Sequence, residues 1–204
     1  MAEKGSVEQF RLFVAIPVPA AVREEILRVQ RQLQPLAPRG AVRWTKPEQF
    51  HLTLRFLGGV SSDHVAGLQE SLRTACSGAA PLYLHAQGVG FFPNARAPRV
   101  IWIGIHDGVG KLEDLQGKIE AAVQPFITER ESERFAGHVT LGRFKQFGHW
   151  HLKALTGQAA AMNDRMFGGW PAPEIGLIRS ELSPTGARHT RLATIPLGTK
   201  IASL

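Results

Sequence analysis

The sequence predicts an α+β protein built from two similar halves. One observation is the order of the elements, in which amphipathic helices are interspersed with short β-prone runs along the whole chain. A second is a four-residue pattern that occurs twice, as HLTL at residues 51–54 and as HVTL at residues 138–141. Because both copies lie in β-prone runs, the repeat favours a pseudo-two-fold arrangement of two lobes.

The individual elements follow from hydrophobic periodicity. Short runs rich in β-branched, aromatic and other apolar residues predict strands. Strands are predicted at residues 11–18, 41–44, 50–57, 81–92, 99–105, 135–144, 174–182 and 191–197. Apolar residues three or four positions apart, with charges between them, predict amphipathic helices. Helices are predicted at residues 20–36, 61–76, 108–126 and 149–162.

Turn-forming residues mark the ends of several elements. Prolines and a glycine at residues 35–40 end the first helix, and Gly58-Gly59 breaks the strand that carries the first motif. The strand at residues 81–92 is expected to loosen into a glycine-containing loop that holds Phe92. On the third helix, Val109 is expected to face inward.

Composition indicates a folded protein with a preference for anionic partners. The chain has 204 residues, of which 44% are hydrophobic and 20% charged, as in ordinary globular proteins. This length supports one domain over residues 1–204 with a substantial core. The formal net charge of +7 favours RNA, DNA or phosphorylated metabolites as partners, although the charge alone is a weak signal.

A single cysteine, Cys76, limits the redox and metal chemistry of the chain. One cysteine cannot form an internal disulfide, which favours a reducing compartment, and it excludes a zinc site built on several thiolates. The N-terminus has no apolar signal core, and no run of eighteen mostly apolar residues predicts a membrane span. We therefore expect a soluble, cytoplasmic protein that acts as a monomer.

Each copy of the repeated pattern places an imidazole beside a hydroxyl. Side chains at positions i and i+2 of a strand share a face, so His51 lies beside Thr53 and His138 beside Thr140. Two histidines that titrate near neutrality can act as a general acid and a general base in phosphodiester hydrolysis. The threonine hydroxyls can donate hydrogen bonds to the charged oxygens of the transition state. This chemistry requires neither a metal ion nor another cofactor.

A chance repeat of structural residues and a metal site are both weaker interpretations of the pattern. The composition predicts about 0.08 chance matches to His, apolar, Thr, apolar, so two chance matches are improbable. Two histidines alone rarely hold zinc, and no nearby Asp, Glu or Cys completes a ligand set. The pattern therefore favours an acid–base site over core histidines or a metal site.

These motifs, with their flanking segments, resemble a known family over nearly the whole chain. The sequence is similar to the two-histidine phosphoesterase superfamily, and within it to the RNA 2′,3′-cyclic phosphodiesterases, also called 2′-5′ RNA ligases. The segments that carry the resemblance are RLFVAIPVP, VRWTKPEQFHLTLRFLGG, GVGFFPNARAPRVIWIGI, FAGHVTLGRF and SELSPTGARHTRLATIPL.

The resemblance implies a bilobal α+β fold, with antiparallel sheets forming a central groove and helices on the outside. It implies that a 2′,3′-cyclic phosphate at an RNA end, of tRNA halves for example, is opened to a 2′-phosphate. In this reaction His51 would be the proton donor and His138 the proton acceptor. The same chemistry in reverse would join RNA ends through a 2′-5′ linkage.

Two other functions remain open from the sequence. The basic charge also fits a non-catalytic module that binds RNA ends. A related enzyme could act instead on small cyclic nucleotides or other small cyclic phosphates. Turnover of an RNA that ends in a cyclic phosphate distinguishes the first alternative, and a comparison with small cyclic phosphates distinguishes the second.

Substrate-binding residues are expected next to the motifs. Strict alternation places Arg55 on the face of His51 and Thr53, whereas the resemblance favours Arg143, whose strand would have to bend near Gly142. We favour Arg143 as the phosphate clamp. Phe92 and Phe56 are candidates for base stacking, although a place in the core is the favoured interpretation for Phe56.

Two positions depart from the family pattern. Gly137 stands where proline is frequent before the second motif, and His189 stands where an aromatic residue is frequent in the closing hairpin. Substrate preference near His189 is therefore open.

Overall fold

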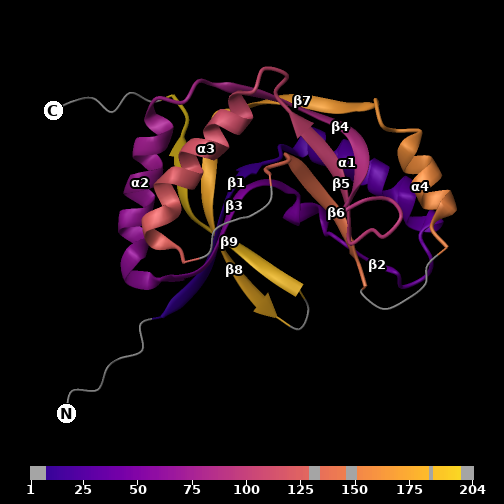
Figure 1. Cartoon of the computed structure of the whole chain (residues 1–204), viewed down its shortest axis with the longest axis horizontal. Helices are drawn as coiled ribbons and strands as arrows, with labels where there is room; N and C mark the ends of the chain where they lie inside the picture. Colours follow the sequence, from indigo (N-terminus) through magenta and orange to yellow (C-terminus); the bar gives the residue numbers. More distant parts are fainter. Residues whose placement is uncertain (1–7, 129–133, 146–150, 184–185, 199–204) are drawn as a thin grey trace, which may run out of the picture.

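The computed structural model describes residues 8–128, 134–145, 151–183 and 186–198, and it confirms the α+β class (Figure 1). In these residues the strands are β1 Gln9–Pro17, β2 Val42–Trp44, β3 His51–Ser61, β4 Leu82–Phe92, β5 Val100–His106, β6 His138–Phe144, β7 Met166–Ala172, β8 Glu174–Ser183 and β9 Gly186–Pro196. The α-helices are α1 Ala20–Leu33, α2 Val65–Ser77, α3 Lys111–Val123 and α4 Lys153–Ala160. Short 3-10 helices occupy Gln34–Leu36, Pro47–Gln49, Ser62–His64 and Gln124–Phe126.

The strands form one curled antiparallel sheet with a symmetric order. Along the sheet the strands lie as β7-β4-β5-β6-β3-β1-β8-β9, and β2 pairs with the outer part of β6. In the described residues, the two halves meet where Leu52 of β3 pairs with Val139 of β6. Along this order, which leaves out β2, four strands lie on either side of the junction, so the two strands that carry the repeated motif occupy equivalent places.

The helices exchange between the two halves. Helix α1 follows β1 but packs on the other half, against β7 and α4, while α3 follows β5 and packs against β3 and α2. Figure 1 shows α2 and α3 together on the left and α1 and α4 together on the right. Each half is therefore built from both parts of the chain.

One hydrophobic core fixes the orientation of the motif strands. The apolar face of α1 is buried at its helical spacing, as predicted, and Leu52 and Val139 are both 0% exposed at the junction. Burial of these alternate side chains forces their neighbours, His51 and His138, to the other side of the sheet. Within the described residues, none of the helices combines the length and apolar character needed to cross a bilayer.

The structure differs from the sequence predictions in several elements. Strand β3 continues through Gly58-Gly59 to Ser61 instead of breaking there, because a register shift beside Gly58, whose φ is 68°, accommodates the glycine. Strand β9 begins at Gly186, earlier than the predicted start at residue 191. Strand β7 was not predicted, because its glycines and proline resemble a loop and it occupies an edge of the sheet. Strand β4 continues through Phe92 instead of loosening into a loop, because a register shift near Gly88 absorbs the glycine. Val109 precedes α3 and is 71% exposed. Helix α4 is shorter than predicted, and His149, at the predicted start, lies outside the described residues.

The alternation argument for Arg55 is wrong. Between Thr53 and Arg55 the pairing of β3 with β1 shifts by one residue, so Arg55 turns away from the face of His51. Its side chain is 4% exposed, and its Nε lies 2.7 Å from Oε2 of Glu120 on α3. This arrangement ties the motif strand to a helix from the other part of the chain.

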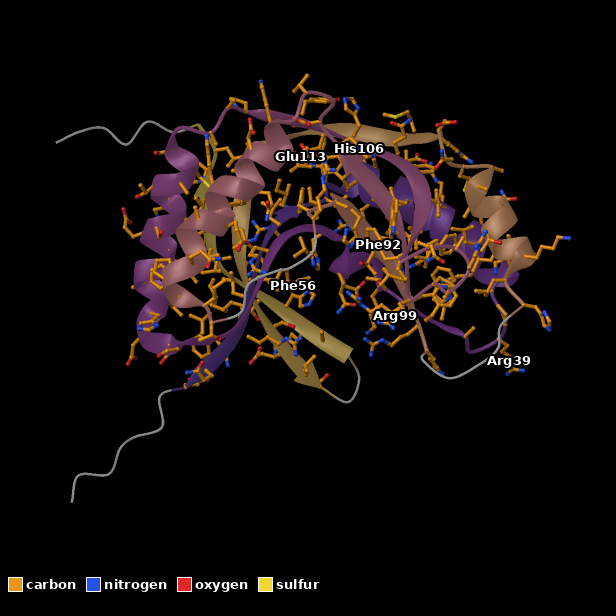
Figure 2. All side chains as sticks on the ribbon, in the orientation of Figure 1. Arg39, Phe56, Phe92, Arg99, His106 and Glu113 are labelled. Atoms are coloured by element: carbon orange, nitrogen blue, oxygen red, sulfur yellow. The ribbon has the colours of Figure 1, made fainter. Side chains whose placement is uncertain are left out.

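We predict that Glu120→Ala lowers the free energy of unfolding by about 2 kcal/mol, because it leaves the buried guanidinium of Arg55 without this carboxylate. Urea denaturation measures the change. The control is Glu113→Ala, which removes an exposed carboxylate from the first turn of the same helix (Figure 2) and should cost less. Equal losses in the two variants would contradict a specific contribution from the Arg55–Glu120 pair.

Candidate active site

The two motifs meet on one face of the sheet, here called the histidine face. Because Leu52 and Val139 pair in antiparallel strands and point into the core, the residues beside them point to the opposite side. On that side, antiparallel geometry sets His51 toward Thr140 and, correspondingly, Thr53 toward His138. All four side chains are half-buried, as expected for groups that are held by the fold but remain accessible.

Each motif strand carries a β-bulge at the same point. In β3 the register shifts at Leu54, between the pairs of Thr53 and Arg55 with β1. In β6 it shifts at Leu141, between the pairs of Thr140 and Gly142 with β5. A bulge inserts one residue and reverses the alternation after it.

The two bulges decide which later side chain reaches the histidine face. It is the second residue after the leucine, which is Phe56 in β3 and Arg143 in β6, and both are exposed. The first residue after the leucine, Arg55 or Gly142, is buried. The bend that directs Arg143 to the histidine face is therefore present in β6. The similar bend in β3 turns Arg55 away from this face.

A buried glutamine supports the bulge in β6. Gln30 of α1 is 2% exposed, and its amide donates hydrogen bonds to the carbonyls of Leu141 at 2.9 Å and Thr45 at 2.8 Å. The backbone N–H of Thr45 also donates to the Leu141 carbonyl, at 2.9 Å. These bonds satisfy buried groups that the irregular ladder would otherwise leave unpaired, and so they fix the backbone from which Arg143 projects.

Both histidines are oriented by the carbonyl two residues before them. Nδ1 of His138 lies 2.8 Å from the carbonyl oxygen of Ala136, and the ring of His51 hydrogen-bonds the carbonyl of Gln49. A carbonyl can only accept, so the bonded ring nitrogen carries the proton. For His138 this leaves Nε2 as the nitrogen that can exchange a proton with a substrate.

Aromatic rings hold each imidazole in place. His51 stacks on Phe13 with ring centroids 4.9 Å apart, and His189 of β9 meets His51 edge-on at 5.4 Å. In the other half, His138 meets Phe92 edge-on at 5.0 Å, and Phe92 packs on Trp102 at 5.0 Å. Such ring contacts limit rotation of the imidazoles and keep their nitrogens in fixed positions.

Burial and positive charge lower the pKa of both histidines. Burial, His189, His138 and Arg143 lower the pKa of His51 to about 4, against a rise caused by the Gln49 carbonyl. Burial and Arg143 also lower the pKa of His138, although the bond to the Ala136 carbonyl raises it. The charge of Arg143 therefore acts on both imidazoles, and the site without a ligand favours their neutral forms.

Sequence reasoning found the motif residues and missed most of their supports. Phe13 belongs to a run predicted only as a buried strand, and its ring contact with His51 depends on β1 pairing with β3. Gln30 lies on the buried face of an amphipathic helix, and a polar side chain among apolar ones was the signal that could have revealed its structural role. Among the predicted binding residues, Phe56 contacts Phe13 at 5.9 Å and Phe92 contacts His138.

We predict that Arg143→Gln raises the pKa of both His51 and His138, because it removes a positive charge that disfavours their protonated forms. NMR titration of the imidazole Cε1–H signals measures both values. The exposed Arg39, which lies at the lower right of Figure 2 away from Phe56 and Phe92, provides the control variant Arg39→Gln. Unchanged titration of both histidines in Arg143→Gln would contradict the placement of Arg143 on the histidine face.

Comparison with known proteins agrees with this architecture. The family model described as LigT like Phosphoesterase matches residues 16–102. The RNA 2′,3′-cyclic phosphodiesterase of Methanocaldococcus jannaschii is 31% identical over 176 residues, 86% of this chain and 94% of that protein. The protein of the same name from Thermus thermophilus is 31% identical over 197 residues, 92% of this chain and 90% of that protein.

Solved structures show the same fold. The crystal structure of TT0787 of Thermus thermophilus superposes with a TM-score of 0.75 at 28% identity, over 92% of this chain and 98% of that one. The Escherichia coli LigT structure complexed with 3′-AMP gives a TM-score of 0.73 over 93% and 99% of the two chains, and at 23% identity it supports the fold alone. The chain thus belongs to the LigT-like phosphoesterase family.

Proposed function

We propose that this protein opens a terminal 2′,3′-cyclic phosphate on RNA to a 2′-phosphate by acid–base catalysis between two histidines. The observation that carries the proposal is the convergence of His51, Thr53, His138 and Thr140 on one face, with Arg143 beside them. The name shared by the curated relatives supports this substrate class.

In the proposed reaction, His138 accepts a proton from water as the water attacks phosphorus. His51 donates a proton to the departing 3′-oxygen, so the bond between phosphorus and that oxygen breaks while the new bond forms. The hydroxyls of Thr53 and Thr140 donate hydrogen bonds to the two non-bridging oxygens, where charge increases in the transition state. Reversal of these steps with an RNA hydroxyl in place of water would give a 2′-5′ linkage.

The substrate itself prepares the acid. Without a ligand, burial and the positive charge of Arg143 disfavour a proton on His51. A bound phosphodiester brings a negative charge between Arg143 and the imidazoles, which raises the histidine pKa values. His51 can then be protonated in the enzyme–substrate complex. The positive charge of Arg143, which lowers the pKa of His51 in the free enzyme, thus also attracts the phosphodiester that raises this pKa again.

Arg143 is the proposed phosphate clamp, because a guanidinium forms paired charge-assisted hydrogen bonds with phosphate oxygens. Phe56 and Phe92 stay predictions as base-stacking residues. Figure 2 labels them on either side of the centre of the molecule. Phe56 contacts Phe13, which stacks on His51, and Phe92 contacts the ring of His138. A weaker affinity of Phe56→Ala for the substrate would support stacking there.

The proposed reaction relies on side chains alone. Among the described residues, no three His, Cys, Asp or Glu side chains gather closely enough to hold a metal ion. Because proton transfer between two histidines and water needs no metal ion, a chelator should leave the activity intact, which is part of the test below. A non-catalytic module that binds RNA ends would need the same basic face but no proton-transfer pair, so turnover separates the two functions.

We predict that the wild-type protein, with a chelator present, converts an RNA ending in a 2′,3′-cyclic phosphate to a 2′-phosphate product. His51→Asn and His138→Asn should each lower kcat at least ~10²-fold, because each removes one proton-transfer group. Phosphorus NMR of the product identifies the broken bond. An intact cyclic end would refute the function, and a 3′-phosphate would show that the wrong leaving oxygen was assigned.

A further inference from the structure

Strand β2 brings a second arginine next to the clamp. Arg43 pairs directly with Arg143 in the antiparallel ladder between β2 and β6. Side chains of directly opposed residues share a face, with Cβ atoms roughly 5 Å apart. Arg43 therefore lies on the histidine face beside Arg143, on the edge of β6 that β3 also occupies, although β2 itself carries no part of the repeated motif.

Arg43 and Arg143 are two exposed, positively charged side chains at directly opposed positions. Among the described residues, neither Arg43 nor Arg143 forms an ion pair with Asp or Glu. Like charges directly opposed across a ladder are unfavourable. Burial and the charge of Arg43 both lower the pKa of Arg143, the direction expected for two neighbouring positive charges. An anion bound between them or beside each of them would relieve it.

The backbone that carries Arg43 is fixed on both sides. The N–H of Thr45 donates to the carbonyl of Leu141 at 2.9 Å, and the N–H of Lys145 donates to the carbonyl of Ala41 at 2.9 Å. These bonds bracket the β2–β6 ladder that holds the two arginines. The pair is thus a preformed feature of the sheet, and ligand binding needs to order the side chains only.

The two arginines lie together at one end of the motif strand β6. Arg143 is five residues along β6 from His138, and Arg43 stands opposite it on β2. Arg143 lowers the pKa of both histidines, whereas the charge of Arg43 lowers the pKa of Arg143. A single phosphate at the histidines would be held by Arg143, and Arg43 is placed for a second anionic group that follows the first along a chain.

We propose that Arg43 forms a second phosphate subsite, which binds the phosphodiester adjacent to the terminal cyclic phosphate of an oligonucleotide. This inference rests on the proposed function, because it uses the cyclic end to set the register of the substrate. It further assigns the substrate class: the enzyme acts on chains of two or more nucleotides in preference to a cyclic mononucleotide. Recognition is of the backbone charge and carries no base preference.

The test compares two substrates that differ by one phosphodiester. These are adenosine 2′,3′-cyclic phosphate and the dinucleotide ApA with a 2′,3′-cyclic phosphate end. A charge-assisted contact with the additional phosphodiester should give wild type about a tenfold higher kcat/KM for the dinucleotide. In Arg43→Gln this advantage should fall to roughly twofold, with the mononucleotide value altered less than about threefold. The ratio of the two kcat/KM values is independent of the fraction of folded protein.

Three controls test whether the preference for the dinucleotide depends on the charge of Arg43 and on the charge of the phosphodiester linkage. A dinucleotide with a neutral methylphosphonate linkage should lose the advantage in wild type. Arg43→Lys keeps a charge and should retain part of the advantage, and Arg39→Gln should keep all of it. The salt dependence of log(kcat/KM) for the dinucleotide should decrease by roughly 0.7 in Arg43→Gln, as expected for the loss of one phosphate contact on a single strand.

Distinct outcomes overturn the subsite or the function. The subsite is refuted if the substrate ratio is the same in wild type and Arg43→Gln, or if the neutral linkage is used as well as the phosphodiester. It is also refuted if Arg43→Gln lowers kcat/KM for both substrates equally, since Arg43 would then act on the cyclic phosphate. Hydrolysis of neither substrate by wild type refutes the proposed function, and the subsite with it.

Discussion

The β-bulge that follows each His-x-Thr motif is the constraint on which the rest of the site depends. Up to the leucine, ordinary alternation directs the imidazole and the hydroxyl to one face and the apolar residues to the core. At Leu54 and Leu141 the alternation reverses, so the next side chain on the histidine face comes one position later than expected. This reversal brings Arg143 to the histidines and sends Arg55 to the core.

The same backbone device serves different purposes in the two halves. In the first half the buried position after the leucine holds Arg55, which reaches Glu120 and ties the sheet to α3. In the second half it holds Gly142, where a Cβ atom would lie 2.6 Å from Val42, so a larger residue would push β2 away. The pseudo-symmetric fold thus supplies two equivalent histidines, while the residues at the bulges make one half a structural anchor and place the proposed phosphate clamp in the other.

Hydrophobic periodicity was sufficient to predict the α+β class, most strands and the two motif pairs, because burial of alternate residues determines these features. It failed where the structure departs from regular alternation. Arg55 was misplaced because a bulge depends on strand pairing, which one strand's sequence does not reveal. The contact between His51 and His189 likewise depends on strands β3 and β9, which are distant in sequence. The resemblance supplied Arg143, which alternation alone would have rejected.

The central claim is that His51 and His138 act as acid and base on one phosphate, and the pH dependence of kcat tests it most directly. We expect a bell-shaped profile in wild type, since one histidine must be protonated and the other neutral in the enzyme–substrate complex. In the His138→Asn variant, the fall in kcat at low pH should disappear. In the His51→Asn variant, the fall in kcat at high pH should disappear. A flat wild-type profile from about pH 5 to 9, or the persistence of both limbs in either variant, would contradict the two-histidine mechanism.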